Sequence, residues 1–379
     1  MNKAIITVIE RVLHTDAPLF LGGDNCHGRR CLVPLRCVLY IAITCSHLLS
    51  ACSGDSIQMP GEEIDGCRIK VASYNLWTSD SRKKYLTSDK SIDRQRFWRP
   101  SSVAMLEAIK DVDCDVLAFQ EICDSIYGRK GAATSLKVMM EKAMPDYSWV
   151  VWSNVDGKRV DDGGRISYTP GICYKTTVLD LTRSGIFWLG GNPDAPRWGD
   201  GFSPEYGDPK RACVWALFRH KESGKQFYFL SAHLDTRSFN GVPYPSVNTE
   251  NCRNLMEYAD AELIPKGVPS IIAGDMNVSD KEEGYIDYLN RNTFRLHHWI
   301  NAYEAARSMS ALGPCAKAGP GTTNTHSEAD GKDRIDHIFY DGFTMKEYEV
   351  ARRKYATRNG TMHYPSDHFP ITATLLFKQ

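Results

Sequence analysis

A series of short apolar runs, rich in β-branched and aromatic residues, constrains the fold of this chain more than any other feature. The runs span residues 69–74, 115–120, 147–152, 171–174, 212–218, 227–232, 270–273, 335–340 and 371–376. Each is bounded by turn-forming residues, as strands are. Segments with helical spacing separate some runs, at 98–111, 132–143 and 248–264, whereas other runs follow one another directly. This order predicts mixed sheets with helices packed outside them, rather than a purely parallel sheet.

The part of the chain that carries these runs is expected to form one domain. No boundary and no internal repeat divides residues 66–379, and a chain of 379 residues is long enough for one large core. Hydrophobic residues make up 42% and charged residues 24%, which is typical of a folded protein. Gly/Pro-rich stretches at 189–209 and 313–323 predict long loops, and long loops in a compact domain often serve function.

The first 51 residues have the features of a signal peptide. An apolar run at residues 37–49 is preceded by a basic flank and followed by Leu49-Ser50-Ala51-Cys52. This ending resembles a bacterial lipobox, so we expect Cys52 to be lipidated and exposed as the new N-terminus. The polar stretch 52–65 would then be a tether. Residues 1–30 are long for such a peptide, which leaves the start codon open to question, and a buried strand with an incidental cysteine is the alternative.

The net charge weighs against a general nuclease. The whole chain carries 46 basic and 46 acidic residues. Without the first 51 residues the formal charge is −2. A protein that grips long nucleic acid usually carries a basic surplus, because phosphate neutralisation supplies much of the affinity. A local basic patch can still exist within a neutral total, so the charge alone does not exclude nuclease activity.

The cysteines downstream of Cys52 do not form a metal-binding pattern. They are Cys67, Cys114, Cys123, Cys173, Cys213, Cys252 and Cys315. Their number is odd and no CxxC pair occurs among them, which disfavours a zinc site with thiolate ligands. We expect most of them to be buried small apolar residues, and one or two disulfides remain open.

Polar side chains interrupt the chain where the predicted strands end. They are Asn75, Glu121, His233 with Asp235, Asp275 with Asn277, Asp336, and Asp367 with His368. Each alone has an ordinary interpretation as a turn residue, a solvated charge or a satisfied histidine. Together they indicate a site, because α/β enzymes build their sites where strand ends converge on one rim.

The order of these groups resembles the endonuclease/exonuclease/phosphatase superfamily. The motifs are Tyr-Asn-Leu-Trp, Phe-Gln-Glu, His-Leu-Asp, Gly-Asp-Met-Asn, Arg-Ile-Asp-His-Ile and Ser-Asp-His-Phe-Pro, all in order over residues 66–379. The resemblance implies an α/β fold of the four-layered sandwich type, in which two mixed sheets pack face to face with helices outside. It also implies a hydrolytic site at one edge of the paired sheets.

Carried over residue by residue, the resemblance implies a Mg²⁺ or Mn²⁺ site. Glu121 would be the principal ligand with Asn75 beside it, and Asp367 would complete this site or a second one. A hard divalent cation prefers such oxygen ligands. The number of ions stays open.

The same resemblance implies roles for the remaining motif residues. His368 would act as general base or orient the attacking water, held by Asp336. Asp275 and Asn277 would position water and phosphate, and their two-residue spacing would put both side chains on one side of an extended segment. His233 would stabilise the negative charge that develops on the phosphate.

Two arginines are candidates for substrate binding. Arg211 follows a Phe-Trp-Leu run, as in a subgroup of secreted bacterial family members, and could bind a phosphate as a fixed fork or simply cover an aromatic face. Arg237 is a weaker candidate. Trp188 and Trp198 would line a substrate wall or pack a loop. Asn324 and His326 could face the site, whereas His337 should point to the opposite face of its strand.

Three function classes follow from these motifs. The first is an exported metal-dependent phosphoester hydrolase for lipid head groups, sugar phosphates or inositol phosphates. The second is an exported nuclease for DNA or RNA, and the third a catalytically silent phosphoester-binding protein. No P-loop, His-Glu-x-x-His or Gly-x-Ser-x-Gly motif occurs, which disfavours P-loop hydrolysis, a zincin and a serine hydrolase. We expect a monomer that is held at a membrane by the lipid.

Overall fold

The computed structural model describes residues 68–77, 94–128, 135–190, 194, 211–236, 238–239, 242–243, 245–290, 296–319, 321–324, 333–357, 360 and 362–378. All of them belong to one compact unit, Ile64–Gln379. The expected signal peptide, Cys52, the tether, Arg237, His326 and Trp198 lie outside the described residues. Within the described part of the chain, no helix is both long and apolar enough to cross a membrane.

The first sheet has six strands in the order β13-β16-β1-β2-β4-β3. Its strands are β1 (Arg68–Asn75), β2 (Val116–Ile122), β3 (Tyr147–Val151), β4 (Thr169–Lys175), β13 (Phe343–Val350) and β16 (Ile371–Phe377). β1 and β2 pair in parallel, and the other neighbours pair antiparallel.

The second sheet also has six strands, in the order β11-β12-β10-β7-β6-β5. Its strands are β5 (Leu179–Trp188), β6 (Ala212–His220), β7 (Gln226–His233), β10 (Ser270–Asp275), β11 (Ile300–Asn301) and β12 (Asp336–Asp341). β7 and β10 are parallel, and the others are antiparallel. Two small hairpins complete the strands, β8 (Ser238–Phe239) with β9 (Val242–Pro243) and β14 (Tyr355–Ala356) with β15 (Met362–His363).

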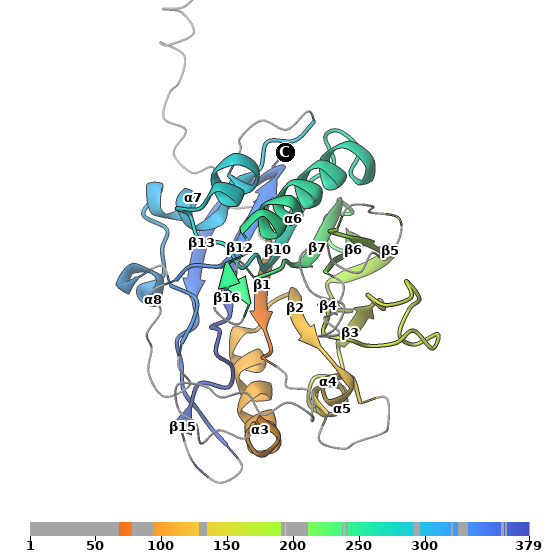
Figure 1. Ribbon diagram of the computed structural model, residues 1–379, viewed down its shortest axis with the longest axis vertical. Coiled ribbons are helices and arrows are strands. Elements are labelled where there is room, and N and C mark those ends of the chain that lie inside the picture. The colour runs from red at the N-terminus through yellow and green to blue at the C-terminus, as the bar shows by residue number, and fades with distance from the viewer. Residues whose placement is uncertain are drawn as a thin grey trace, which may run out of the picture. The chain divides into compact units, whose positions relative to one another are not determined.

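Helices cover the outer faces of the two sheets (Figure 1). The helices beside the first sheet are α3 (Arg94–Val112), α4 (Asp124–Tyr127) and α5 (Leu136–Ala143). Those beside the second are α6 (Pro245–Tyr258), which continues into the π-helical turn η2 (Ala259–Leu263), and η3 (Tyr285–Leu289). The short helices α7 (Ala302–Ser308) and α8 (Pro314–Ala318) pack near β13. The layers confirm the predicted four-layered α/β sandwich.

The alternation of side chains along each strand explains these layers. In β1, Ile69 and Val71 belong to the core between the sheets, whereas Tyr74 packs in the outer core with α3 and α5. In β7, Phe229 faces the first sheet and Leu230 packs against α6 and its neighbours. Successive side chains of a strand point to opposite faces, so every central strand contributes to two apolar layers.

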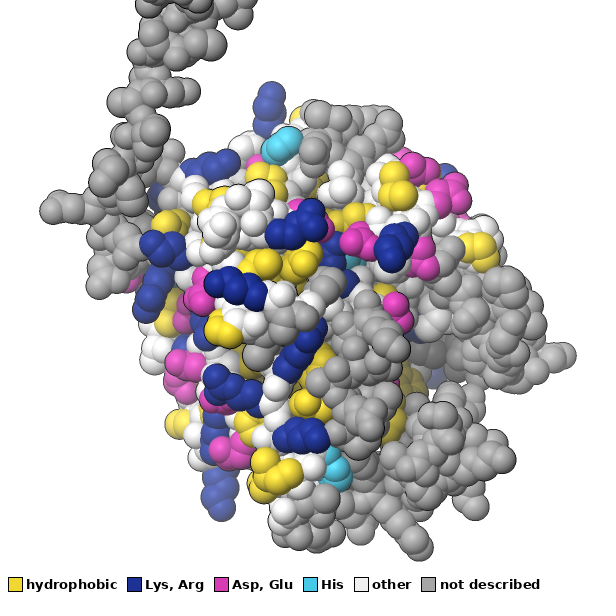
Figure 2. Space-filling view, turned by 90° about the vertical axis from the view of Figure 1, so that its left-hand side faces the viewer, with side chains coloured by type: hydrophobic (Ala, Val, Ile, Leu, Met, Phe, Trp, Pro, Cys, Tyr) yellow, Lys and Arg dark blue, Asp and Glu magenta, His cyan; other side chains and the backbone are white. Residues whose placement is uncertain are grey.

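The structure contains elements that the sequence-based expectation did not include, among them β5, β13 and α8. β5 and β13 were not among the predicted apolar runs, and α8 lies within the expected loop 313–323. β13 is an edge strand whose exposed residues are polar, and Figure 2 views this side of the molecule, where Lys and Arg side chains are interspersed with fewer acidic ones. Charged residues on an edge oppose pairing with another chain. Part of that edge is also covered, because Gly313 N donates to Tyr348 O at 2.8 Å.

Candidate functional site

Four adjacent strands of the second sheet bring their ends into one row. The register pairs Ala212 with His233, His233 with Asp275, and Asp275 with Asp336, across β6, β7, β10 and β12. Residues directly opposite each other in a sheet present their side chains on the same face. The row therefore collects one histidine and two carboxylates at one edge of the sheet, and all three are buried.

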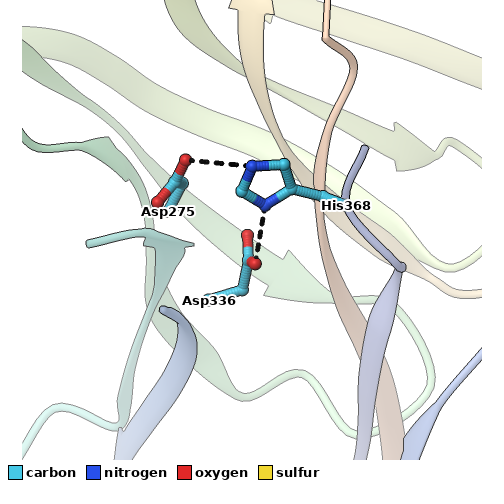
Figure 3. Close-up of side chains that lie close together, drawn as sticks. All are labelled: Asp275, Asp336 and His368. Atoms are coloured by element: carbon cyan, nitrogen blue, oxygen red, sulfur yellow. Dashed lines mark hydrogen bonds and ion pairs between the residues drawn. The ribbon is translucent and has the colours of Figure 1, made fainter. Parts of the chain in front are cut away.

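His368 reaches this row from the loop before β16 of the other sheet (Figure 3). Its Nδ1 donates to Asp336 Oδ2 at 2.8 Å, and its Nε2 lies 3.7 Å from Asp275 Oδ2. Ser366 fixes the loop, because its hydroxyl donates to Asn75 O at 2.7 Å and accepts from His368 N at 3.1 Å. The ring is thus oriented by one carboxylate and directs its second nitrogen toward another.

Charges in this cluster shift its proton affinities strongly. Burial alone would lower the pKa of His368, but the carboxylates of Asp336 and Asp275 raise that pKa well above its ordinary value. Burial raises the pKa of Asp275 to about 6, with Asp336 adding to the shift and His368 opposing it. The pocket therefore stabilises an imidazolium at His368, as expected where an imidazole accepts a proton beside a carboxylate.

His233 differs in charge from His368 although both contact Asp275. Its Nε2 lies 3.6 Å from Asp275 Oδ2. Burial, followed by the positive charges of Arg211 and His368, lowers the pKa of His233 well below its usual value. Within the part of the chain that the structure describes, its Nδ1 has no hydrogen-bond partner. A neutral imidazole that has a ring nitrogen without a hydrogen-bond partner among these residues, as His233 has in Nδ1, can bind a further polar group.

Asn75 and Glu121 come from adjacent ends of β1 and β2 in the first sheet. Asn75 Nδ2 donates to Asp275 Oδ2 at 2.9 Å, which joins the two sheets at the site. Asn75 Oδ1 accepts from Trp77 N at 2.9 Å and keeps a second lone pair. Glu121 is half-buried in an irregular stretch of β2 and has φ of 62°, a left-handed conformation that is unusual for a residue with a side chain. Such an irregularity redirects a side chain away from regular alternation.

The donor set suits a divalent cation. Asp275, Asp336 and His368 each offer one ligand atom, and these atoms lie within 4.8 Å of one another. Asp336 Oδ1 is buried and has no hydrogen-bond partner among the residues described. Carboxylate and amide oxygens of Glu121 and Asn75 lie at the ends of neighbouring strands of the other sheet. An oxygen-rich pocket of this kind fits Mg²⁺ or Mn²⁺.

The expectation that Asp275 and Asn277 lie on an extended segment is wrong. The chain leaves β10 at Asp275, and Asn277 has φ of 49°. Asn277 N donates to Asp275 Oδ1 at 2.9 Å, and Asn277 Nδ2 donates to Leu234 O at 2.9 Å. The segment forms a tight turn in which Asp275 accepts from its own backbone two residues on, as Asp often does in turns. The side-chain oxygen of Asn277 is then the group left for the site.

The remaining candidates from the sequence, Arg211, Trp188 and Asn324, occupy different surroundings. Arg211 Nε donates to Asp235 Oδ1 at 2.9 Å, and no aromatic ring among the described residues lies under its guanidinium. Trp188 is buried and its Nε1 donates to Asn154 O at 2.8 Å, so it packs a loop. Asn324 N donates to Asp367 O at 2.7 Å, next to His368.

His337 faces away from the row of acidic side chains. Its Nε2 lies 2.9 Å from Val278 O and its Nδ1 lies 3.4 Å from Asn301 Nδ2. The five described cysteines are buried and form no disulfide with one another, as expected for small apolar residues; they are Cys114, Cys123, Cys173, Cys213 and Cys252.

Sequence reasoning missed the residues that support the site. Ser366 belongs to the Ser-Asp-His-Phe-Pro motif but had no predicted role, and the motifs do not include Asn248 and Asn251 of α6. Asn248 Nδ2 donates to Asp235 O at 2.6 Å and to Met276 O at 2.9 Å, and Asn251 Oδ1 accepts from Asp235 N at 2.9 Å. Buried asparagines on the apolar face of an amphipathic helix were the available signal, because buried amides need partners.

Comparison with protein families identifies the fold and the motifs together. The profile of the Endonuclease/Exonuclease/phosphatase family matches residues 72–368, which includes every motif residue of the site from Asn75 to His368. The chain belongs to this family. Members are metal-dependent phosphoesterases, so the chain is a phosphoester hydrolase of this type by family. A search of curated proteins finds no match.

Solved structures agree with this assignment. A family protein from Bacteroides thetaiotaomicron is 25% identical with a TM-score of 0.62, covering 82% of this chain and 95% of that one. A mannosyl-6-phosphatase from the same species is also 25% identical with a TM-score of 0.61, covering 82% of this chain and 100% of that one. The human Nocturnin catalytic domain with bound sulfate shares the fold at 16% identity and a TM-score of 0.55, covering 82% of this chain and 95% of that one.

Proposed function

We propose that the protein is a divalent-metal-dependent phosphoester hydrolase in which a water molecule attacks phosphorus with the help of His368 and Asp336. The hydrogen bond of 2.8 Å between His368 Nδ1 and Asp336 Oδ2 carries this proposal, because it leaves Nε2 as the nitrogen that faces the site. A carboxylate on one ring nitrogen fixes the tautomer and stabilises the imidazolium after proton transfer.

Each remaining side chain has a task in this reaction. Asp275, 3.7 Å from His368 Nε2, orients the water, and the side-chain oxygen of Asn277 beside it contacts the water or the phosphate. His233, kept neutral by burial, donates a ring N–H to a phosphate oxygen as negative charge develops. The water oxygen bonds to phosphorus as its proton passes to His368 Nε2, the ester P–O bond breaks, and the departing alkoxide takes a proton from solvent to leave as the alcohol.

A cation would be held by Glu121 and Asn75, with Asp367 beside them, rather than by the cluster of Asp275, Asp336 and His368, in which Asp336 binds the imidazole that serves as the base. When bound, it would neutralise the phosphate and polarise the bond to phosphorus. Asp367 Oδ1 lies 3.9 Å from His368 Nε2, so a carboxylate borders the catalytic imidazole on the first-sheet side as well. The oxygen of Asn75 is already aligned by its hydrogen bond from Trp77 N.

We propose small phosphorylated sugars as the first substrates to test. Two observations support this choice. One similar structure, at 25% identity, is a mannosyl-6-phosphatase. The chain downstream of residue 51 has a formal charge of −2, which does not favour long nucleic acid.

The test measures Mg²⁺- or Mn²⁺-dependent phosphate release from mannose 6-phosphate, inositol phosphates, sphingomyelin, plasmid DNA and RNA. Wild type is compared with His368→Ala and Glu121→Gln. The exposed His298→Ala serves as the matched histidine control. We expect one activity that EDTA, His368→Ala and Glu121→Gln each remove, whereas His298→Ala retains it.

A wild-type protein that is inert on the whole panel and binds no divalent cation would overturn the enzymatic proposal in favour of a binding protein. Release from DNA or RNA alone would replace the sugar phosphate with a nuclease substrate. Activity that survives both site substitutions would place the chemistry elsewhere in the chain.

We also propose that the protein is exported and anchored through a lipid on Cys52, and that it acts as a monomer. The basic flank, apolar run and small residues before Cys52 support the anchor. Cys52→Ser should move the protein from the membrane fraction to the soluble fraction in a bacterial host, and unchanged fractionation would contradict the anchor.

A further inference from the structure

Arg211 and Asp235 form a buried ion pair next to the catalytic row, and the reaction described above does not use it. Arg211 Nε donates to Asp235 Oδ1 at 2.9 Å, and the side chains are 14% and 6% exposed. Arg211 directly precedes Ala212, whose register partner is His233. The guanidinium also acts on His233, where its charge helps to lower the pKa. The pair therefore lies beside the histidine assigned to the phosphate.

Asp235 is fixed on both sides before Arg211 binds to it. Its backbone N–H donates to Asn251 Oδ1 at 2.9 Å and its carbonyl accepts from Asn248 Nδ2 at 2.6 Å. Both amides belong to α6, and Asn248 also binds Met276 O in the turn after Asp275. The same helix thus holds the Asp235 segment and the Asp275 turn in one arrangement.

The two terminal nitrogens of the guanidinium, Nη1 and Nη2, have no partner within the part of the chain that the structure describes, whereas Asp235 occupies Nε. These two nitrogens form a planar fork that matches two oxygens of a phosphate. A buried carboxylate that holds Nε fixes the direction of that fork, so little side-chain entropy is lost when an anion binds.

We propose that Arg211, oriented by Asp235, makes the site selective for phosphomonoesters over phosphodiesters. This inference rests on the proposed hydrolase function and names the substrate class of the same site. A monoester carries a charge of about −1.5 to −2 at pH 7 and three non-bridging oxygens. A diester carries one negative charge and two such oxygens, and its second ester group occupies the space of the third oxygen. A fixed cation in a partly buried site favours the more highly charged ester.

Arg211 is the substrate-binding residue in this scheme, and Asp235 is a positioning residue that acts through it. Asp235 carries a negative charge that would repel the phosphate if Arg211 were absent. Removal of the guanidinium should therefore harm monoester turnover for two reasons, the lost hydrogen bonds and the exposed carboxylate.

The test compares kcat/KM for p-nitrophenyl phosphate with that for bis-p-nitrophenyl phosphate, using the full chain with Mg²⁺. The variants are Arg211→Gln, Arg211→Lys and Asp235→Asn. Arg219→Gln is the matched control, because Arg219 is on β6, which begins directly after Arg211, and pairs with Asp180 on the exposed surface. We expect Arg211→Gln to lower the monoester value at least about tenfold, the effect of a lost hydrogen bond to a charged group, with a much smaller change for the diester.

The remaining variants separate positioning from charge. Arg211→Lys retains the charge without the fork and should recover part of the monoester activity. Asp235→Asn should raise KM for the monoester more than it lowers kcat, a split that a general loss of stability would not produce. Equal losses for both substrates, or no loss with Arg211→Gln, would overturn the proposed selectivity.

Binding of inorganic phosphate decides the same question if the wild type hydrolyses neither ester. Calorimetric titration with inorganic phosphate and with dimethyl phosphate, in the presence of Mg²⁺, should show tighter binding of inorganic phosphate that Arg211→Gln weakens. Such a result would sustain the selectivity while the hydrolase proposal fails. Equal affinity of both anions for the wild type would overturn the selectivity itself.

Discussion

Gly274 shows how little space the residues next to the catalytic row have. It precedes Asp275 in β10, and a Cβ at this position would lie 2.1 Å from Ala232 O on the neighbouring strand β7. Real side chains do not approach a backbone oxygen so closely, so β10 or β7 would have to move. Because Asp275 and His233 are directly paired across the same two strands, any such movement changes the distance between them.

We expect Gly274→Ala to destabilise the fold by about 1–3 kcal/mol, the usual cost of overpacking, and to lower activity more than that loss explains. Urea unfolding and phosphate release measured on the same preparation test this. Gly190→Ala is the control, because a Cβ there meets nothing within 4 Å. Equal stability of the two variants would show that the strands adjust without cost.

The sequence predicted which residues lie together at the site more successfully than it predicted how each side chain is oriented there. Asn75, Asp275, Asp336 and His368 could be assembled from motifs because strand ends share a rim. The turn at Asn277 could not, because its positive φ depends on hydrogen bonds to Asp275 and to Leu234 O of another strand. Periodicity describes only the regular parts of a chain, and this turn begins where the regular strand ends.

At the level of elements, Arg334 joins β12 to its surroundings. Its guanidinium donates to Asp280 Oδ2 at 3.0 Å, to Glu304 Oε1 of α7 at 2.8 Å and to Asn301 Oδ1 at 3.2 Å. The guanidinium also lies 4.4 Å from the ring centroid of Tyr303. Because Asp336 is two residues along the chain, this buried network fixes the start of the strand that carries it.

Arg334→Ala should lower the free energy of unfolding by about 1.5–3 kcal/mol, because a guanidinium that is only 2% exposed loses its hydrogen bonds to Asp280, Glu304 and Asn301. The matched control is Arg307→Ala, which also loses a partner of Glu304 but from a side chain that is 64% exposed. That exposed pair should contribute no more than about 1 kcal/mol. Urea denaturation of both variants gives the comparison, and similar losses would contradict the role of the network.

His297 connects the end of β12 to the π-helical turn η2. Its Nδ1 lies 2.9 Å from Asp341 Oδ2 and its Nε2 lies 3.1 Å from Ile264 O. Both neighbours are acceptors, so both ring nitrogens must donate and the imidazole is charged. Burial opposes that charge, but Asp341, the Ile264 carbonyl and Asp260 raise the pKa of His297. Burial alone would raise the pKa of Asp341. The hydrogen bond and the charge of His297 outweigh burial, so the pKa of Asp341 lies below its ordinary value.

The signs of these shifts define a pH window for stability. A raised histidine pKa stabilises the fold below the unfolded value of about 6.5, and the effect is lost as pH rises through the folded pKa. A lowered aspartate pKa stabilises the fold above about 3.9, and that effect is lost as pH falls through the folded pKa. The pair should therefore contribute most between about pH 4 and 6.5. The free energies of unfolding of wild type and His297→Gln are measured from pH 4 to 9 in the presence of EDTA. The difference between the two proteins should shrink at alkaline pH. A difference that does not change with pH would contradict a charged His297.

Strands could be predicted from the sequence where both of their faces are buried. β2, β7 and β10 are buried along nearly their whole length and read as continuous apolar runs. β5 and β13 carry exposed polar residues in their middle because they lie at sheet edges, so they lack that signal. α8 was missed for a similar reason, since a five-residue helix is too short to show periodicity.

At the scale of the whole molecule, a bound cation should link function to stability. A ligand that binds only the folded state stabilises it by about 2.7 kcal/mol at a concentration one hundred times its dissociation constant. Addition of Mn²⁺ or Mg²⁺ should therefore raise the melting temperature, and EDTA should reverse the rise. Glu121→Gln should weaken this response more than His298→Ala does. A melting temperature that no divalent cation changes would argue against a cation site in this fold.

The two sheets contribute different halves of the site. Asn75, Glu121 and His368 come from the first sheet, whereas Asp275 and Asp336 come from the second, with direct bonds from Asn75 to Asp275 and from His368 to Asp336. Neither sheet alone holds His368 together with Asp336, the carboxylate that orients it. Recovery of turnover during refolding would then report the docking of the sheets rather than the formation of either one. A fragment containing a single sheet should never regain chemistry, however well its strands pair.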